Sequence, residues 1–202
     1  MPDFFEFPPT RSNRVKWALE ELEIDYASHI VDFYTGEQQS PEYRTIHPLG
    51  HVPVYSTDHY SMHESVAIVL QLMDEYSERG FSPALKTPER AEYYQWCVFS
   101  SAELDPALFD IMKHTMHLPE DQRVVEIAER ALSRFAQRAD MLSEVLENRD
   151  FILGSAFSGA DIVLGYCCNW AAYVGQIAAH PVLLDYYARL QQRPAFKKVF
   201  DT

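Results

Sequence analysis

Hydroxyl side chains stand at two places where the sequence predicts the start of a helix. Thr10 and Ser12 precede an apolar helical pattern that begins at Val15, and Ser65 precedes another that begins at Val66. The first amides of a helix have no partner within it, so a hydroxyl oxygen can accept a hydrogen bond from one of them. These amides and the helix dipole also attract a negatively charged group. Both positions could therefore cap a helix, hold an anion, or do both.

The cysteines and one pair of histidines offer less specific chemistry. Cys167 and Cys168 are adjacent and no C-x-x-C spacing occurs, so we expect them and Cys97 to be reduced, packed thiols. His114 and His117 could share a helix face, but zinc needs further ligands and none lies nearby. We therefore expect two surface histidines and no metal. The sequence also contains no G-x-S-x-G motif, phosphate-binding glycine loop or nucleotide fingerprint.

The composition is that of a folded protein with one or two domains. The chain has 202 residues, of which 47% are hydrophobic and 23% charged, and its net charge is −13. An acidic surface is repelled by phosphate backbones, so we expect no nucleic acid as a partner. No apolar run reaches the length of a membrane span, and the first residues resemble no secretory signal. Together with reduced thiols, this predicts a cytoplasmic protein that does not bind membranes.

The first part of the chain alternates strand and helix patterns. A short aromatic strand at 4–7 is followed by a helix from Val15, a strand at 27–33 and a short helix from Pro41. Two strand patterns at 52–56 and 60–62 then precede the helix that begins near Ser65. Strand–helix–strand order favours a parallel pair with a crossover helix. We predict a small α/β domain over residues 1–78.

The second part of the chain carries mainly helix signals. Residues 77–88 are polar and contain glycine and prolines, which indicates a linker, and Thr87-Pro88-Glu89 then opens a helix. Pro106 is expected to break or kink that helix. Further helices are expected after Leu118-Pro119, His180-Pro181 and Arg193-Pro194. We predict an all-helical domain over residues 87–202.

A capping box is predicted at Ser158-Gly159-Ala160-Asp161. The Ser158 side chain would cap the following helix, and the Asp161 carboxylate would accept from the Ser158 amide. Phe157 and Ile162 flank this motif and are placed to form its hydrophobic staple.

Four local patterns occur in one order along the chain. They are Thr10-Arg11-Ser12 before the helix at 15–22, His47-Pro48-Leu49-Gly50-His51-Val52-Pro53, Glu64-Ser65-Val66-Ala67-Ile68, and Ser158-Gly159-Ala160-Asp161. Together they resemble the cytosolic glutathione S-transferases, particularly the bacterial ones, over nearly the whole chain. This resemblance implies a thioredoxin-like N-terminal domain, an all-α C-terminal glutathione S-transferase domain and a homodimer. The predicted order of elements agrees with that plan.

The resemblance also implies which residues would bind glutathione. The residue matching Pro53 follows a cis bond in the family, and the Val52 backbone would pair with the cysteinyl part of glutathione as an added strand. Glu64 would accept from the γ-glutamyl ammonium, and Ser65 would hold the γ-glutamyl carboxylate at a helix start. His51 stands where many members carry a lysine that meets the glycyl carboxylate. The alternative interpretations are a trans proline, an ordinary helix cap and an exposed loop histidine.

The residue that would activate the glutathione sulfur lies between the first strand and the first helix in the family. Relatives place a tyrosine, serine or cysteine there, and residues 8–12 contain neither tyrosine nor cysteine. Thr10 or Ser12 could donate a hydrogen bond to the sulfur, which favours the thiolate, and Arg11 could add positive charge. Thr10 is the first choice. Alternatively, Thr10 and Ser12 only cap the helix and Arg11 is solvated.

The resemblance implies a glutathione transferase that conjugates glutathione to a hydrophobic electrophile, as in detoxification. In the family the electrophile lies between the domains, and the candidates to line its site here are Tyr94, Phe99, Phe109 and Met112, unless they are plain core. The alternatives are a glutathione-dependent disulfide or peroxide reductase, an enzyme like maleylacetoacetate isomerase, or a non-catalytic member that binds a protein. The isomerase-like members carry Ser-Ser-Cys, which Pro9-Thr10-Arg11 does not match.

Overall fold

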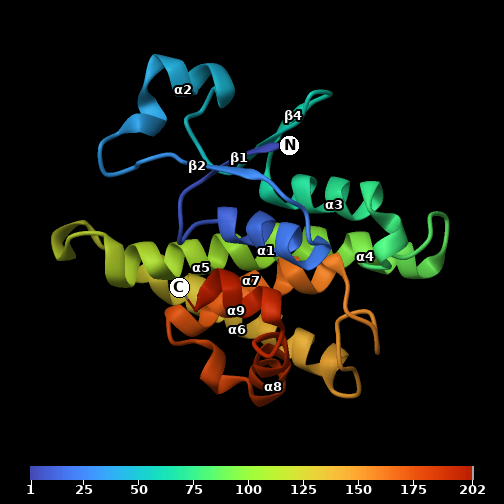
Figure 1. Cartoon of the computed structure of the whole chain (residues 1–202). Helices are drawn as coiled ribbons and strands as arrows, with labels where there is room; N and C mark the ends of the chain where they lie inside the picture. The colour runs from blue at the N-terminus through green and yellow to red at the C-terminus, as the bar shows by residue number, and fades with distance from the viewer. Residues whose placement is uncertain (202) are drawn as a thin grey trace. The chain divides into compact units, whose positions relative to one another are not determined.

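The chain forms two compact units in a computed structural model that describes residues 1–201. The first unit contains Met1–Gly80 and the segment from Pro194 onward, and the second contains Phe81–Arg193. The first unit is a sheet with helices, and the second is helical (Figure 1). This is the predicted fold class, a thioredoxin-like domain and an all-α domain.

The sheet of the first unit has four short strands in the order β2-β1-β3-β4. They are β1 (Asp3–Glu6), β2 (Ala27–Ile30), β3 (Val54–Ser56) and β4 (Ser61–His63). β1 is parallel to β2 and antiparallel to β3, and β3 is antiparallel to β4. The parallel pair inferred from the strand–helix–strand order is therefore confirmed.

Helices cover both faces of this sheet. α1 (Ser12–Leu22) and α3 (Ser65–Glu75) pack together on one face, and the short α2 (Pro41–Ile46) lies on the other (Figure 1). The 3-10 turns η1 (Glu37–Gln39) and η2 (Ser77–Arg79) complete the connections. Apolar positions three and four apart on α1 and α3 are buried, as the periodicity predicts.

The last helix, α9 (Pro194–Phe200), belongs to the first unit. The ring of Phe196 packs edge-on against Trp17 of α1 with centroids 5.0 Å apart, and Phe200 does the same at 5.8 Å. Trp17 is fully buried. The sequence prediction places this helix with the second domain because it follows the other helices in the chain. α9 lies against α1 because its two phenylalanines bury the large apolar ring of Trp17.

The second unit consists of helices and helical turns. The bounds are α4 (Pro88–Phe99), η3 (Ser100–Leu104), α5 (Asp105–Met112), η4 (Lys113–His117), η5 (Glu120–Gln122), α6 (Val125–Leu146), α7 (Gly159–Tyr173), η6 (Ile177–Ala179) and α8 (Pro181–Leu190). η3 and η4 are π-helical turns, so helical backbone runs from 88 to 117.

Pro106 does not break this long helix, and the expectation of a break is wrong. It lies in the first turn of α5, directly after the π-helical turn η3. The amide of Asp105 bonds to the carbonyl of Ser100, five residues back. The change of hydrogen-bond period therefore falls just before the proline, where its missing amide is accommodated.

The capping box at the start of α7 is confirmed. The Asp161 carboxylate is fully buried and accepts from the Ser158 amide and hydroxyl, both at 2.8 Å. It also accepts from the amide of Ile152 at 2.8 Å and from the hydroxyl of Tyr186 at 2.9 Å. One carboxylate therefore joins the loop before α7, the helix itself and α8.

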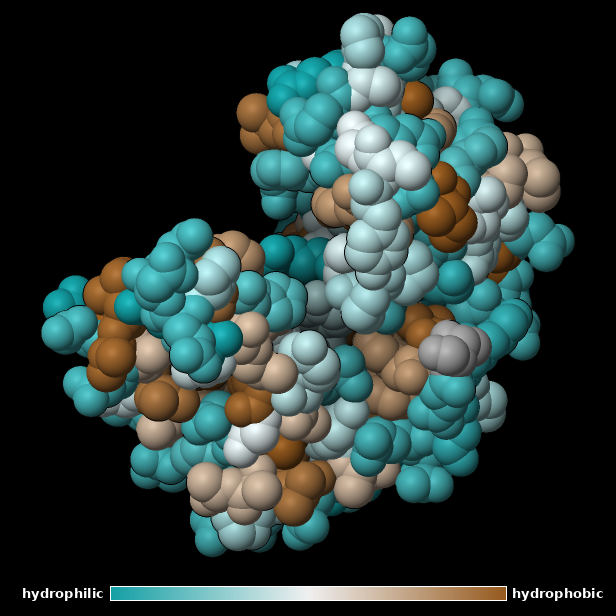
Figure 2. Space-filling view, turned by 90° about the vertical axis from the view of Figure 1, so that its left-hand side faces the viewer, coloured by the Kyte–Doolittle hydropathy of each residue, from teal (hydrophilic) through white to brown (hydrophobic). Residues whose placement is uncertain are grey.

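The structure also describes the thiols, the length of the helices and the groups of side chains that could bind a metal. All three cysteines are buried thiols that form no disulfide bond within the described residues. Within residues 1–201, no helix is long and apolar enough to cross a membrane, and no group of three or more histidine, cysteine or acidic side chains has the geometry of a metal site. Hydrophilic side chains cover much of the face in Figure 2, with apolar ones in separate groups.

Candidate functional site

The turn between β1 and α1 separates the two hydroxyls that the sequence singles out. Ser12 is fully buried, and its Oγ accepts from the Phe7 amide at 3.3 Å. Thr10 is half-buried; its hydroxyl donates to the Phe7 carbonyl, and its Oγ1 lies 3.0 Å from the Ser12 Oγ. Thr10 also accepts from the Ser12 amide at 3.2 Å. Both hydroxyls stabilise the turn, and only that of Thr10 belongs to a partly exposed residue.

The loop that carries His51 and Val52 is held in place from α2. The Tyr43 hydroxyl donates to the His51 carbonyl at 2.7 Å, and the Gly50 amide donates to the His47 carbonyl at 2.8 Å. Gly50 has a φ of +63°, and a Cβ there would lie 2.2 Å from the Gln38 carbonyl oxygen, so only glycine fits. This explains why glycine occupies position 50 of the motif at 47–53.

Val52 and Pro53 lie directly before β3. The bond between them is cis, as the resemblance implies, and Pro8-Pro9 is a second cis bond that the sequence did not indicate. Val52 is half-buried and precedes the paired residues of β3, and no backbone hydrogen bond of its own is found within residues 1–201. Its amide and carbonyl are thus placed to pair with an extended ligand.

Glu64 and Ser65 mark the junction of β4 and α3. Glu64 has a φ of +73° and a ψ of +102°, a conformation that costs a non-glycine residue about 1–3 kcal/mol. Its side chain is exposed and does not cap α3. Ser65 is the first residue of α3 and is buried. The Glu64 carboxylate is therefore accessible to solvent at the start of α3.

Arg14 is a residue of this site that the sequence prediction missed. It is fully buried, and its Nη1 donates to the Ser65 hydroxyl at 3.0 Å. A guanidinium beside the start of α3 adds positive charge to that of the free amides, so the position favours a carboxylate. A signal was available: Arg14 lies four residues before Ala18 and thus on the apolar face of α1.

Three histidines cluster beside the same segments. The His47 ring is 4% exposed and its centroid lies 4.7 Å from that of His63 and 5.4 Å from that of His51. The amide of Leu49 donates to Nδ1 of His47 at 3.2 Å. Burial, and then the proximity of His63 and His51, lower the pKa of His47, although Glu64 opposes this. The sequence prediction included His51 and missed the other two, because no short spacing pairs them.

The structure therefore links the three predicted segments of the first unit. Arg14 connects α1 to the start of α3, and the histidine cluster connects the loop before β3 to the end of β4. Arg11 is half-buried and occupies the N-cap position of α1. The starts of two helices and two arginines contribute positive charge to this region, which suits the carboxylates of an anionic peptide.

The four residues predicted to line an electrophile site lie on two helices of the second unit. Tyr94 and Phe99 belong to α4, and Phe109 and Met112 to α5. Tyr94 is 39% exposed and Phe109 is 41% exposed, while Phe99 and Met112 are half-buried. None of the four is a fully buried core residue, so each has surface to offer a ligand.

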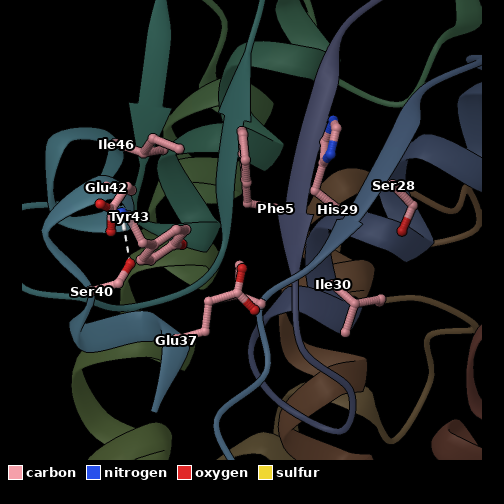
Figure 3. A pocket seen from close by; sticks show the side chains of 10 residues that line it. Phe5, Ser28, His29, Ile30, Glu37, Ser40, Glu42, Tyr43 and Ile46 are labelled. Carbon is pink, nitrogen blue, oxygen red and sulfur yellow. Dashed lines mark hydrogen bonds between the residues drawn. The ribbon is translucent and has the colours of Figure 1, made fainter. Parts of the chain in front are cut away.

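A separate cavity of about 460 Å³ lies on the α2 side of the sheet. Phe5 lies between Tyr43 of α2 and His29 of β2, and Glu37 approaches from η1 (Figure 3). None of the predicted site residues lines it. Tyr43 connects the cavity to the predicted site through its hydrogen bond to the His51 carbonyl.

Two protein-family models match this chain, one in each part of it. The model of the glutathione S-transferase N-terminal domain matches residues 5–80, and that of the C-terminal domain matches residues 124–189. The chain belongs to the glutathione S-transferase family. The residues matched by the N-terminal model include all the predicted glutathione-binding positions, from His51 to Ser65.

Individual members of the glutathione S-transferase family match most of the chain. The disulfide-bond oxidoreductase YfcG of Escherichia coli (strain K12) is 28% identical over 203 residues, covering 96% of this chain and 92% of that protein. Glutathione S-transferase F10 of Arabidopsis thaliana is 27% identical over 200 residues, covering 93% and 91%. A sphingomonad glutathione S-transferase, solved in complex with glutathione, is 27% identical and superimposes with a TM-score of 0.85 over 98% of this chain and 97% of that one.

Proposed function

We propose that this glutathione S-transferase family member binds glutathione on its first unit and uses the Thr10 hydroxyl to stabilise the thiolate. The observation that carries the choice of residue is the contrast between Thr10 and Ser12. Ser12 is fully buried and its oxygen accepts from the Phe7 amide, whereas Thr10 is partly exposed and would turn its hydroxyl proton from the Phe7 carbonyl to the sulfur. A hydroxyl that donates to sulfur favours the charged form, and the start of α1 adds to this. Arg11 supplies positive charge from the same turn.

The glutathione backbone would lie along the segments that the structure links. The cysteinyl part pairs with the amide and carbonyl of Val52, beside Pro53. The γ-glutamyl carboxylate docks at Ser65, whose hydroxyl is held by Arg14, and the ammonium reaches the exposed Glu64 carboxylate. His51 receives the glycyl carboxylate. The glutathione complex of the sphingomonad relative supports a glutathione ligand for this fold.

The leading reaction is conjugation. The glutathione thiolate attacks an electrophilic carbon, an S–C bond forms, and the leaving group departs with the electron pair of its bond to carbon. Tyr94, Phe99, Phe109 and Met112 supply apolar contacts to the electrophile. A homodimer, a cytoplasmic location and a role in detoxification complete the proposal and come from the family resemblance.

Disulfide reduction is a second candidate, because YfcG, a disulfide-bond oxidoreductase, is similar over 96% of this chain. The thiolate of glutathione would attack one sulfur of a disulfide and release the other as a thiolate. A second glutathione would then attack the mixed disulfide, which yields oxidised glutathione and a second thiol. The protein's own thiols are unsuited to this role: all three are buried, and burial raises the pKa of Cys168.

Calorimetry of reduced glutathione and S-hexylglutathione tests the binding step. Binding of both supports a peptide site with an adjacent apolar pocket, and no binding at millimolar ligand refutes the proposal. Turnover then separates the two reactions: consumption of a chlorinated nitrobenzene indicates conjugation, and reduction of hydroxyethyl disulfide indicates the reductase. Light scattering on the eluting protein tests the dimer.

A further inference from the structure

The cavity on the α2 side of the sheet lies apart from the residues assigned to glutathione. It is built from β1, β2, η1 and α2, so it belongs entirely to the first unit. Its volume of about 460 Å³ falls within the range of roughly 300–1,000 Å³ that is typical of small-molecule sites. The proposed reaction makes no use of it. Its lining therefore indicates what kind of second ligand it would take.

Aromatic rings form one wall of this cavity. The Phe5 ring of β1 stacks on the His29 ring of β2, with centroids 4.8 Å apart and planes inclined by 21°. The Tyr43 ring lies 6.1 Å from Phe5 by centroid. Ile30 and Ile46 stand on either side of these rings, and Ile30 is 54% exposed (Figure 3). Such a surface suits a flat apolar group, such as the aromatic ring of a ligand.

The free charges around the cavity are negative. Glu37 and Glu42 contribute carboxylates to the lining, and no lysine or arginine within residues 1–201 lines it. The guanidinium of Arg44, also on α2, bonds to the Pro48 carbonyl and to the Gln39 side chain instead. The net charge of the whole chain is −13. A cation is therefore attracted to this cavity, and an anion is repelled.

Two other polar side chains at the cavity are paired within the sheet. The Ser28 hydroxyl donates to Glu6 at 2.7 Å. The Nε2 atom of His29 lies 2.7 Å from Oδ1 of Asp3, so a proton on this imidazole is balanced by a carboxylate beside it. Neither side chain adds uncompensated positive charge to the lining.

Glu37 is the carboxylate with a fixed position. Its Oε2 atom accepts from the Asp32 amide at 2.7 Å. In Figure 3 its side chain extends from η1 into the space between Tyr43 and Ile30. Its charge also reaches Tyr43, where it adds to the effect of burial in raising the pKa of the hydroxyl. A carboxylate already held in place loses little freedom when it binds an ammonium group.

We propose that this cavity binds small organic ammonium ions that carry an aromatic ring. The ring of the ligand lies against Phe5 and His29, and its ammonium group donates to the Glu37 carboxylate. The nearby aromatic rings add a cation–π attraction. This inference goes beyond the proposed function, because it requires neither glutathione nor any residue of the second unit.

Three indole derivatives that differ in the group at the end of the side chain test the preference for charge. They are tryptamine with an ammonium, tryptophol with a hydroxyl and indole-3-acetate with a carboxylate. In calorimetry of the full-length protein near neutral pH, we expect tryptamine to bind about fivefold more tightly than tryptophol, the effect of a solvent-exposed ion pair and a cation–π contact. Indole-3-acetate should bind more weakly than either. Equal affinities for tryptamine and tryptophol, or no binding of tryptamine at millimolar concentration, would overturn the inference.

The variant Glu37→Gln tests the position of the site. Glutamine retains an oxygen for the Asp32 amide and loses only the charge. We expect it to weaken tryptamine binding about threefold and to leave tryptophol binding unchanged. Glu78→Gln, the same change on the exposed turn η2, is the matched control and should alter neither affinity. A preference for tryptamine that survives in Glu37→Gln would refute this placement.

Saturation with S-hexylglutathione separates this cavity from the apolar pocket proposed beside the glutathione site. We expect tryptamine to bind equally well with and without it. Displacement of tryptamine would locate the amine in the other pocket and would contradict the inference, while the proposed function would stand. Conversely, a protein that fails to bind S-hexylglutathione and glutathione but shows the Glu37-dependent affinity for tryptamine would support the inference and refute the proposed function.

Discussion

The Nη1 atom of Arg14 lies 3.0 Å from the Oγ atom of Ser65 and donates a hydrogen bond to it across 51 residues of sequence. Both residues are buried. A hydroxyl that accepts from a guanidinium keeps its own proton available to donate. Arg14 therefore fixes the position of the Ser65 oxygen and leaves its proton for a ligand.

Replacing Arg14 should weaken glutathione binding through Ser65. We expect Arg14→Met to weaken binding about tenfold, which corresponds to the loss of one charge-assisted hydrogen bond. Ser65→Ala should cost a similar amount, and the double variant little more than either single one, because the two residues act as a unit. Calorimetry of the four proteins measures this. Arg130→Met, an exposed change on α6, is the matched control, and additive losses would contradict the idea.

Thr10 should matter for turnover more than for binding. Thr10→Ala is expected to lower kcat about a hundredfold, the typical cost of one donor to a developing or stabilised anion. The glutathione dissociation constant should change little, and Thr10→Ser should restore most of the rate. Ultraviolet difference absorption of the bound thiolate gives a readout independent of the electrophile. If Ser12→Ala abolishes the thiolate signal in a folded protein while Thr10→Ala keeps it, the assignment is wrong.

Replacing Glu64 with glycine should have opposite effects on the stability of the fold and on the affinity for glutathione. Glycine at this position relieves the positive φ, so we expect Glu64→Gly to raise the free energy of unfolding by about 1 kcal/mol. It should also weaken glutathione binding about tenfold, since the ammonium loses its carboxylate. Glu64→Gln keeps the strain and removes the charge, so it should weaken binding without the gain in stability. Urea unfolding and calorimetry together check both effects.

The buried Asp161 should be among the most sensitive positions for stability. Asp161→Asn places an NH₂ group where donors converge, and we expect it to lower the free energy of unfolding by about 3–4 kcal/mol. Tyr186→Phe removes one of the four donors and should cost about 1 kcal/mol. Thermal and urea unfolding measure both. Equal losses for the two variants would show that the other donors contribute little.

His47 should make the fold sensitive to acid. Its pKa is lowered in the folded state, so its contribution to stability is present above the ordinary histidine pKa of about 6.5 and is lost as the pH falls below it. We expect His47→Asn, which keeps an acceptor for the Leu49 amide, to flatten the decline in unfolding free energy between about pH 7 and about pH 5. His59→Gln should leave that decline unchanged.

Local signals were sufficient to predict most elements of this fold from the sequence. Apolar spacing gave α1 and α3, Pro41 gave the start of α2, and Ser158 with Asp161 gave the capping box, because each depends on residues within a few positions of one another. The break expected at Pro106 does not occur, because a π-helical turn directly precedes α5, and a proline rule does not predict such a turn. The position of α9 was missed for the same reason: Trp17 and Phe196 are far apart in sequence.

The residues of the candidate site also divide into those that short motifs predict and those that depend on contacts between distant segments. Val52, Pro53, Glu64 and Ser65 stand in short motifs and could be named in advance. The apolar spacing of α1 could have drawn attention to Arg14, but its hydrogen bond to Ser65 joins two separate segments, as does the contact of His63 with His47. No spacing rule predicts either contact. The positive φ of Glu64 could not be predicted from the sequence either, since a glutamate does not indicate an unusual backbone conformation.

The contact between α9 and α1 has a consequence for how the protein is made. Trp17 is covered by Phe196 and Phe200, which leave the ribosome long after it. During synthesis of the whole second unit, the nascent first unit therefore exposes an indole and the apolar surface around it. Such surface is a binding site for chaperones and a starting point for aggregation. The first unit is thus the first to be translated and the last to be completed.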